Sequence, residues 1–293
     1  MATKFRAWDD YYIPGTTVLR NKFNETDAAT LSAKEEFAAS ARLDQLADAP
    51  VEGRFDYVHM KAIHRHIFQD VYEGAGQERV GPLSRMTKDG PDVVNFAPGD
   101  PAAPVVTYGY YPSPGIADAA NEQYRMLARE DHLVGLPRAQ FVERLAEHWG
   151  ELNTIHSFRE GNTRSQFVFF SQLAENAGYS LDAEQFKVGA SLRDEFVAAR
   201  FYVQATTRID RLAAVLDKAL TKIGPDSLGQ TVAREHTLSE RAQMPRGIDA
   251  VRLAQGESAA PATEAVKQHP GSSRSSTRTH PTPAQDRSRG RGD

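Results

Sequence analysis

"IHSFREGNTRSQFVFF", residues 155 to 170, places a polar loop directly before a strongly apolar segment. The loop contains a histidine, an acid, a Gly-Asn pair and an arginine. The segment from Phe167 to Phe170 is apolar on every side of a helix, and a helix of that kind is buried. The stretch therefore predicts a helix over residues 163–177 that lies in the middle of the fold, with Asn162 as its cap and Gly178 after its end.

Helical patterns occupy most of the first 221 residues. Arg138 to Ile155 has apolar residues at spacings of four, four and three, which is typical of an amphipathic helix. A second amphipathic pattern places Val58, Ile63 and Ile67 on one face, followed by a stop at Gly74. Composition and periodicity together predict helices over residues 31–48, 55–73, 116–131, 138–155, 163–177, 183–199 and 201–221.

Residues 77 to 115 have a different character, because glycine and proline are frequent there. Two β-branched or aromatic segments lie among them, Val93 to Phe96 and Val105 to Tyr111. We expect extended structure with tight turns, in the form of a hairpin. The fold class predicted by these patterns is a mainly α domain with one extended insertion.

Composition excludes several classes of protein. The net charge of −4 argues against a general nucleic-acid binder, and the absence of cysteine excludes disulfides and thiolate chemistry. No apolar segment approaches the roughly 20 residues that a membrane helix needs. The first residues lack the basic start and apolar core of a signal peptide. We expect no membrane partner and a cytoplasmic location at synthesis.

The helical pattern fades after Gly224, so residues 224–293 form a tail. Its last stretch, residues 268–293, is dominated by Ser, Thr, Pro, Arg and Gly and contains almost nothing that a core would bury. Such a segment is predicted to be a low-complexity, disordered tail. Arginine outnumbers aspartate at its end, so the tail is basic while the body is acidic. Two interpretations stay open: a solvated tail, or a segment that binds a partner, nucleic acid or a secretion machine.

The polar loop at 156–164 suits phosphate chemistry. A helix N-terminus binds anions, Gly161 permits a close backbone approach, and Arg164 is able to hold a phosphate with two hydrogen bonds. Glu160 fits beside a phosphate when Mg²⁺ bridges the two. His156 is suited to take a proton near neutral pH. This set predicts phosphoryl or nucleotidyl transfer to a hydroxyl, whereas the plainer alternative is a turn whose polar groups face water.

"HSFREGNTR", residues 156 to 164, resembles the signature of the Fic (Fic/Doc) family, His-Pro-Phe-x-Asp/Glu-Gly-Asn-Gly-Arg-x-x-Arg. The resemblance extends over roughly residues 10 to 220. It implies a Fic-type helical bundle with a short β-hairpin flap at about 88–112. It also implies an N-terminal arm over 1–30, a Fic domain over 31–223 and the tail beyond.

The resemblance implies a protein adenylyltransferase, which moves AMP from ATP to a Ser, Thr or Tyr hydroxyl of a target protein. It assigns His156 as the general base, Phe158 as the anchor of the loop and Glu160 as the Mg²⁺ ligand. The phosphates would be held by Gly161, Asn162, Thr163 and Arg164. The target backbone would pair with the flap at Val93, Val94, Asn95 and Phe96.

Three positions depart from the family signature. Ser157 stands in place of proline, and Thr163 in place of the second glycine. Phe167 stands where the second arginine belongs, which in relatives holds the outer phosphates and pairs with an inhibitory glutamate. The family's inhibitory motif has one match, "SQLAEN" at 171 to 176, which lies in the expected central helix on the wrong side of the cradle. We therefore expect no inhibitory helix within the chain. The resemblance then implies inhibition of the protein by a separate small antitoxin, which is the usual alternative in the family.

Other functions stay open at this point. A Fic enzyme with another donor, such as UTP, GTP or phosphocholine, is one, and a catalytically weak module that binds a nucleotide or a target is another. Toxin-type relatives modify ATPase subunits of type II topoisomerases, which makes such a subunit a candidate target, and secretion as an effector is a further possibility. His59, His64 and His66 lie close together in sequence, and we expect them to pack the helix rather than bind a metal.

Overall fold

The computed structural model describes residues 5–186 and 189–224, so the predicted tail lies outside the described residues from 225 onward. The helices are α1 (Ala28–Asp48), α2 (Tyr57–Phe68), α3 (Ile116–Arg129), α4 (Arg138–Ile155), α5 (Asn162–Asn176), α6 (Arg193–Thr206) and α7 (Asp210–Ala219). The strands are β1 (Arg85–Pro91), β2 (Val105–Pro112), β3 (Tyr179–Leu181) and β4 (Leu220–Lys222). Short 3-10 turns are η1 (Trp8–Tyr11), η2 (Ser113–Gly115), η3 (Asp131–Leu133) and η4 (Ala183–Phe186).

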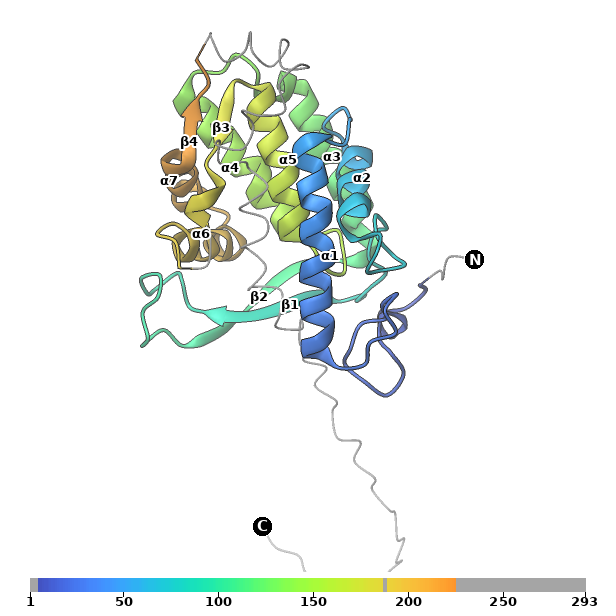
Figure 1. Cartoon of the computed structure of the whole chain (residues 1–293). Coiled ribbons are helices and arrows are strands. Elements are labelled where there is room, and N and C mark those ends of the chain that lie inside the picture. The colour runs from blue at the N-terminus through green and yellow to red at the C-terminus, as the bar shows by residue number, and fades with distance from the viewer. Residues whose placement is uncertain (1–4, 187–188, 225–293) are drawn as a thin grey trace, which may run out of the picture.

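Helix α5 lies in the middle of the bundle, as the sequence predicts. It packs against α2 on one side and α4 on the other. In Figure 1 it lies between α6 and α7 on the left and α1 and α2 on the right. All four residues from Phe167 to Phe170 are buried. The mainly α fold class is confirmed.

An aromatic cluster joins α5 to α4 and α6. The ring centroid of Phe167 lies 5.1 Å from that of Trp149 on α4 and 5.1 Å from that of Phe196 on α6. Phe186 closes the cluster at 5.3 Å. Aromatic pairs at these separations gain energy beyond the burial of their area. Position 167 is therefore part of the hydrophobic core.

Strands β1 and β2 form the predicted hairpin, with antiparallel pairs from Arg85 with Pro112 to Pro91 with Val105. The expectation of an extended segment from Val93 to Phe96 is wrong, since these residues belong to the connection between the strands. The Asp92 carboxylate accepts hydrogen bonds from the backbone N–H groups of residues 94 and 95 and so stabilises a turn.

The hairpin is attached to the helical bundle at several points. The Gln204 amide donates to the Gly109 carbonyl at 2.9 Å, and the Arg211 guanidinium donates to the Val93 carbonyl. The Tyr108 ring stacks on Phe201 of α6 with centroids 4.4 Å apart. Figure 1 shows the hairpin crossing one end of the bundle, where these contacts are made.

Some helix boundaries differ from the predictions. Helix α2 ends at Phe68, before Gly74, and Val58 is 73% exposed rather than part of the buried face. The predicted helix over 201–221 is divided, because Thr207 has φ of 63° and ends α6. Its last residues form β4, which pairs with β3 in a small sheet that the sequence does not indicate. Among the described residues, no helix is long and apolar enough to cross a membrane.

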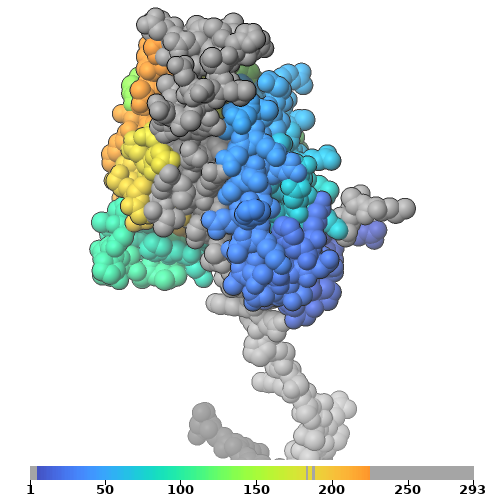
Figure 2. Space-filling view, viewed as in Figure 1, coloured from blue at the N-terminus to red at the C-terminus, as the bar shows by residue number. Residues whose placement is uncertain are grey.

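The N-terminal arm packs on the base of the hairpin. Phe5, Trp8 and Tyr11 form a cluster with Met86 of β1 and Tyr110 of β2. The arm leads into α1, whose first turn is capped by a side-chain carboxylate. In Figure 2 the arm and α1 form one side of the visible face, in blue, while the hairpin connection lies at the opposite side.

Replacement of Phe167 by alanine should lower the free energy of unfolding by about 3–5 kcal/mol, because it leaves a cavity in the aromatic cluster. The matched control is Phe37→Ala, since the Phe37 side chain is 80% exposed. That change should stay within about 0.5 kcal/mol of the parent. Urea unfolding measures both. Equal stability of the two variants would contradict a core role for Phe167.

Candidate active site

The side chain of Asn162 closes the loop between α4 and α5 with two hydrogen bonds to Phe158. Helix α4 ends at Ile155, and the following residue, His156, adopts the left-handed conformation, with φ of 52°. The Asn162 amide oxygen accepts from the Phe158 N–H at 2.9 Å, and its amide nitrogen donates to the Phe158 carbonyl at 2.7 Å. Asn162 was expected in the phosphate cradle, and the structure engages its side chain in folding the loop. Phe158 is buried, as an anchor residue should be.

Arg79 fastens the loop to the hairpin. Its guanidinium donates from Nε to the His156 carbonyl at 2.7 Å and from Nη2 to the Tyr111 carbonyl of β2. Its backbone N–H donates to the Ser157 carbonyl at 2.9 Å. Burial lowers the pKa of Arg79 to about 10, which leaves it charged at neutral pH. The sequence contains no local signal for this role, because the partners are distant in the chain.

Helix α2 supports the other end of the loop. Gly161 has φ of +78°, and a Cβ atom there would lie 2.2 Å from the ring of Phe68. His64 donates from Nε2 to the Glu160 carbonyl at 2.9 Å, accepts at Nδ1 from the Gly76 N–H and stacks on Phe158. Burial lowers the pKa of His64 to about 3, so it stays neutral.

No group of three metal-ligating side chains is present among the described residues. The neighbouring His59 places its Nε2 2.8 Å from the Val51 carbonyl. The hydrogen bonds and ring contacts of His64 and His59 thus hold α2 in place, which is the packing role expected from the sequence.

His156 is arranged to accept a proton. Its Nδ1 lies 3.3 Å from the Asn153 carbonyl. A carbonyl only accepts, so Nδ1 carries the hydrogen and Nε2 keeps its lone pair. Burial, followed by the charges of Arg79 and Arg200, holds the pKa of His156 well below its usual value. The ring packs on Tyr110 of β2, with centroids 4.1 Å apart. The neutral imidazole that a general base needs is therefore the stable form near pH 7.

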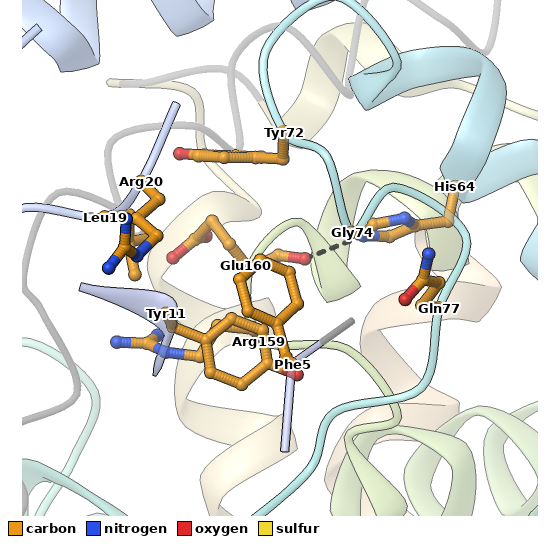
Figure 3. Close-up of a pocket in the computed structure, with 10 residues that line it drawn as sticks. All are labelled: Phe5, Tyr11, Leu19, Arg20, His64, Tyr72, Gly74, Gln77, Arg159 and Glu160. Carbon is orange, nitrogen blue, oxygen red and sulfur yellow. Dashed lines mark hydrogen bonds between the residues drawn. The ribbon is translucent and has the colours of Figure 1, made fainter. Parts of the chain in front are cut away.

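Glu160 lies in a pocket between the loop and the N-terminal arm, with about 400 Å³ of open space including its mouth. Figure 3 shows its carboxylate at the centre, with Tyr72 and Arg20 on one side of it. Burial, and then the negative charge of Glu35, raise the pKa of the Glu160 carboxyl. A carboxylate in such a place is favoured in its charged form by an added cation.

The Arg164 guanidinium lies against α1. It forms an ion pair with Glu35, whose carboxylate also accepts a hydrogen bond from the Tyr72 hydroxyl. It stacks on the ring of Phe68 at 4.5 Å and approaches Glu160 at 4.0 Å. Arg164 was expected to hold phosphate, and the structure gives its charge a carboxylate partner instead. The sequence gives no indication of Glu35.

The side chain of Thr163 is directed toward helix α6. Its hydroxyl accepts a hydrogen bond of 3.0 Å from Nη2 of Arg200 on α6. The same guanidinium donates from Nε to the Asn153 side-chain oxygen at 3.0 Å. Successive residues of a helix point about 100° apart, so Thr163 and Arg164 belong to two different environments. The expected cradle residues are adjacent in sequence but are not gathered at one point.

Removal of the Glu35 carboxylate by Glu35→Ala should destabilise the protein by about 3–5 kcal/mol, because Arg164 would remain as a buried charge without its partner. Glu36→Ala is the matched control, since Glu36 is exposed on the same helix. It should change the free energy of unfolding by less than about 0.5 kcal/mol. Chemical denaturation of both variants measures these changes in the free energy of unfolding. A loss below about 1 kcal/mol for Glu35→Ala would show that water replaces the ion pair.

Comparison with known proteins places these features in a family. The model of the Fic/DOC family matches residues 54–174. The chain is similar to the probable protein adenylyltransferase y4lH of Sinorhizobium fredii, with 35% identity over 175 residues, which are 59% of this chain and 79% of that protein. It is 37% identical over 174 residues to the protein adenylyltransferase VbhT of Bartonella schoenbuchensis, but the match spans 32% of VbhT.

A solved structure has the same fold. The N-terminal FIC domain of Bep8, a VirB-translocated effector protein of Bartonella sp. 1-1C, superposes with a TM-score of 0.60 and 25% identity, covering 76% of this chain and 98% of that one. The signature loop, the hairpin beside it and the matched relatives agree. The chain belongs to the Fic/DOC family.

Proposed function

We propose that the protein is a protein adenylyltransferase, which moves AMP from ATP to a hydroxyl group of a target protein. The observation that carries the proposal is the neutral His156 at the mouth of α5, with its Nε2 lone pair available. The names of the relatives y4lH and VbhT support AMP as the transferred group.

The reaction follows from the position of His156. Its Nε2 takes the proton of the target hydroxyl while the oxygen attacks the α-phosphorus of ATP. A bond forms between the target oxygen and the α-phosphorus, which gives a phosphodiester. The bond from the α-phosphorus to the oxygen that bridges the α- and β-phosphates breaks, and pyrophosphate leaves. Catalysis of this type depends on positioning and on stabilisation of charge, which the backbone N–H groups of the first turn of α5 supply.

The donor set fits Mg²⁺ through Glu160. Magnesium ions at nucleotide sites commonly have one or two carboxylate ligands and complete their shell with substrate phosphates and water. Glu160 is a half-buried carboxylate with a raised pKa, in the same loop as His156. When bound there, Mg²⁺ would neutralise charge on the phosphates. The chain's own contribution is to hold the Glu160 backbone in place through His64.

The target protein would be presented by the hairpin. Within the described residues β1 pairs with β2 and with no other strand, which leaves its second edge available for strand addition. The turn at residues 93–96 would flank that edge. We infer a protein target with an accessible Ser, Thr or Tyr, and an ATPase subunit of a type II topoisomerase is the first candidate. Toxin-like or effector action, and restraint by a small antitoxin, are parts of the same proposal. The similar fold of Bep8, a translocated effector, supports effector action.

Transfer of label from α-labelled ATP, beside UTP, GTP and CTP with Mg²⁺, tests the function on bacterial lysate and on a purified topoisomerase ATPase subunit. ATP should be preferred. His156→Ala should reduce transfer by about 10²–10⁴-fold, which is the usual contribution of a general base, while ATP affinity stays within a few-fold. His66→Ala, on α2 and outside the loop, is the control.

Each other result has a defined meaning. Full transfer by His156→Ala would contradict its assignment as the base. Preference for another nucleotide would replace ATP as the donor. Absence of transfer with all four, together with measurable nucleotide binding, would identify a binding module.

The pH dependence of transfer should reflect the lowered pKa of His156. An ordinary histidine would be half protonated near pH 6.5, and loss of the free base would halve the rate there. Because burial favours neutral His156, the rate should stay level as the pH falls from about 8 to about 6.5, with its acid limb below that value. The rate at saturating ATP and target, measured across this range, provides the check. A midpoint at or above 6.5 would contradict a buried neutral base.

A further inference from the structure

We propose that Tyr110 of β2 is a positioning residue for His156, whose imidazole it holds in the orientation that presents Nε2 to the target hydroxyl. The inference rests on the proposed function and deepens it, because it places a determinant of the base outside the signature loop. The hairpin then takes part in the chemical step as well as in the presentation of the target protein.

The covalent structure of His156 leaves the plane of its ring undetermined. Rotation of an imidazole about its Cβ–Cγ bond has broad, roughly two-fold minima. A half-turn about this bond exchanges Nδ1 with a ring carbon and moves the Nε2 lone pair. The hydrogen bond from Nδ1 to the Asn153 carbonyl is 3.3 Å long, which is beyond the usual range, so it holds the ring weakly. The orientation of the base therefore depends on packing.

The Tyr110 ring supplies this packing. Its centroid lies 4.1 Å from that of the His156 ring, and the two planes are inclined by 39°. Rotation about the Cβ–Cγ bond would push an edge of the imidazole into the tyrosine ring. Close-packed side chains resist a movement of this kind. The contact thus keeps Nδ1 toward the Asn153 carbonyl and leaves Nε2 on the other edge of the ring.

Tyr110 is itself fixed by the surrounding structure. Its side chain is 5% exposed and belongs to the buried cluster at the base of the hairpin. The residues on either side of it are attached to other elements. The Gly109 carbonyl accepts a hydrogen bond from Gln204 of α6, and the Tyr111 carbonyl accepts one from Arg79. The tyrosine ring therefore presents a rigid surface to the imidazole.

Steady-state kinetics of adenylyl transfer by wild type, Tyr110→Leu and Tyr110→Phe test the proposal. Tyr110→Leu should lower kcat by about 10–100-fold, because a small displacement of a catalytic group is costly, and should change the KM for ATP by less than about threefold. Tyr110→Phe keeps the ring, so its kcat should stay within about threefold of wild type. Met86→Ala is the control, since it removes a buried side chain of the same cluster and leaves Tyr110 in place. Its kcat should also stay within about threefold of wild type.

Nitrogen NMR of isotope-labelled histidine gives a second readout, which needs neither ATP nor a target. The ring signals of His156 are those that His156→Ala removes, and their chemical shifts distinguish a proton on Nδ1 from one on Nε2. Wild type, Tyr110→Phe and Met86→Ala should show the Nδ1–H form. Tyr110→Leu should show a mixture of the two tautomers, because a mobile ring exchanges its carbonyl partner for water.

Gln204→Met covers the case in which Tyr110→Leu does not fold. It removes the hydrogen bond to the Gly109 carbonyl and leaves every ring of the cluster in place. The strand that carries Tyr110 then loses one of its two attachments. We expect kcat to fall by about 3–10-fold, with an unchanged KM for ATP and a partial mixture of His156 tautomers.

The outcomes separate the inference from the proposed function. If either kcat or the His156 tautomer is unchanged in Tyr110→Leu, or in Gln204→Met when Tyr110→Leu does not fold, the inference is overturned while adenylyl transfer stands. An equal loss of kcat in Met86→Ala would show a general loosening of the cluster and overturn the inference as well. Absence of transfer by wild type would overturn the proposed function, and the role of Tyr110 with it.

Discussion

The buried guanidinium of Arg79 holds together the parts on which the site depends. Helix α4 ends in a loop that is mostly buried, and carbonyl groups at a helix end have no partner within the helix. Arg79 donates to the His156 carbonyl and to the Tyr111 carbonyl of β2, and so satisfies both. An unsatisfied buried carbonyl costs about 1–3 kcal/mol. One side chain therefore contacts both His156 and the hairpin and fixes their relative position.

Helix α5 divides the site into two environments. One face meets α1 and α2, where Arg164 is balanced by Glu35. The other face meets α4 and α6, where Thr163 contacts Arg200. Because neighbouring positions on a helix point in different directions, a contiguous signature does not form a contiguous cradle. The geometry of the helix thus explains why residues that are adjacent in the signature have their partners on different helices.

The features that the sequence predicts best are those set by residues close together in the chain. The bounds of α4 follow from the spacing of Phe141, Leu145 and Trp149, and the central place of α5 follows from its uninterrupted apolar segment. The loop itself was found because its residues are consecutive. Long-range partners are not encoded in any local pattern, so Glu35 and Arg200 were missed. At 93–96, valine and phenylalanine favour a strand, but the hydrogen bonds of the Asp92 carboxylate outweigh that propensity.

The attachment of the hairpin has a consequence for the rate at which a partner binds. Gln204 and Arg211 tie the strand β2 and the start of the connection to the bundle, and Tyr108 is stacked on Phe201. A strand edge held in this way has lost most of its conformational freedom before any encounter. Only the incoming chain then loses conformational entropy on binding, and association requires no rearrangement of the hairpin. Selection among partners accordingly depends on whether their own segment is able to become extended.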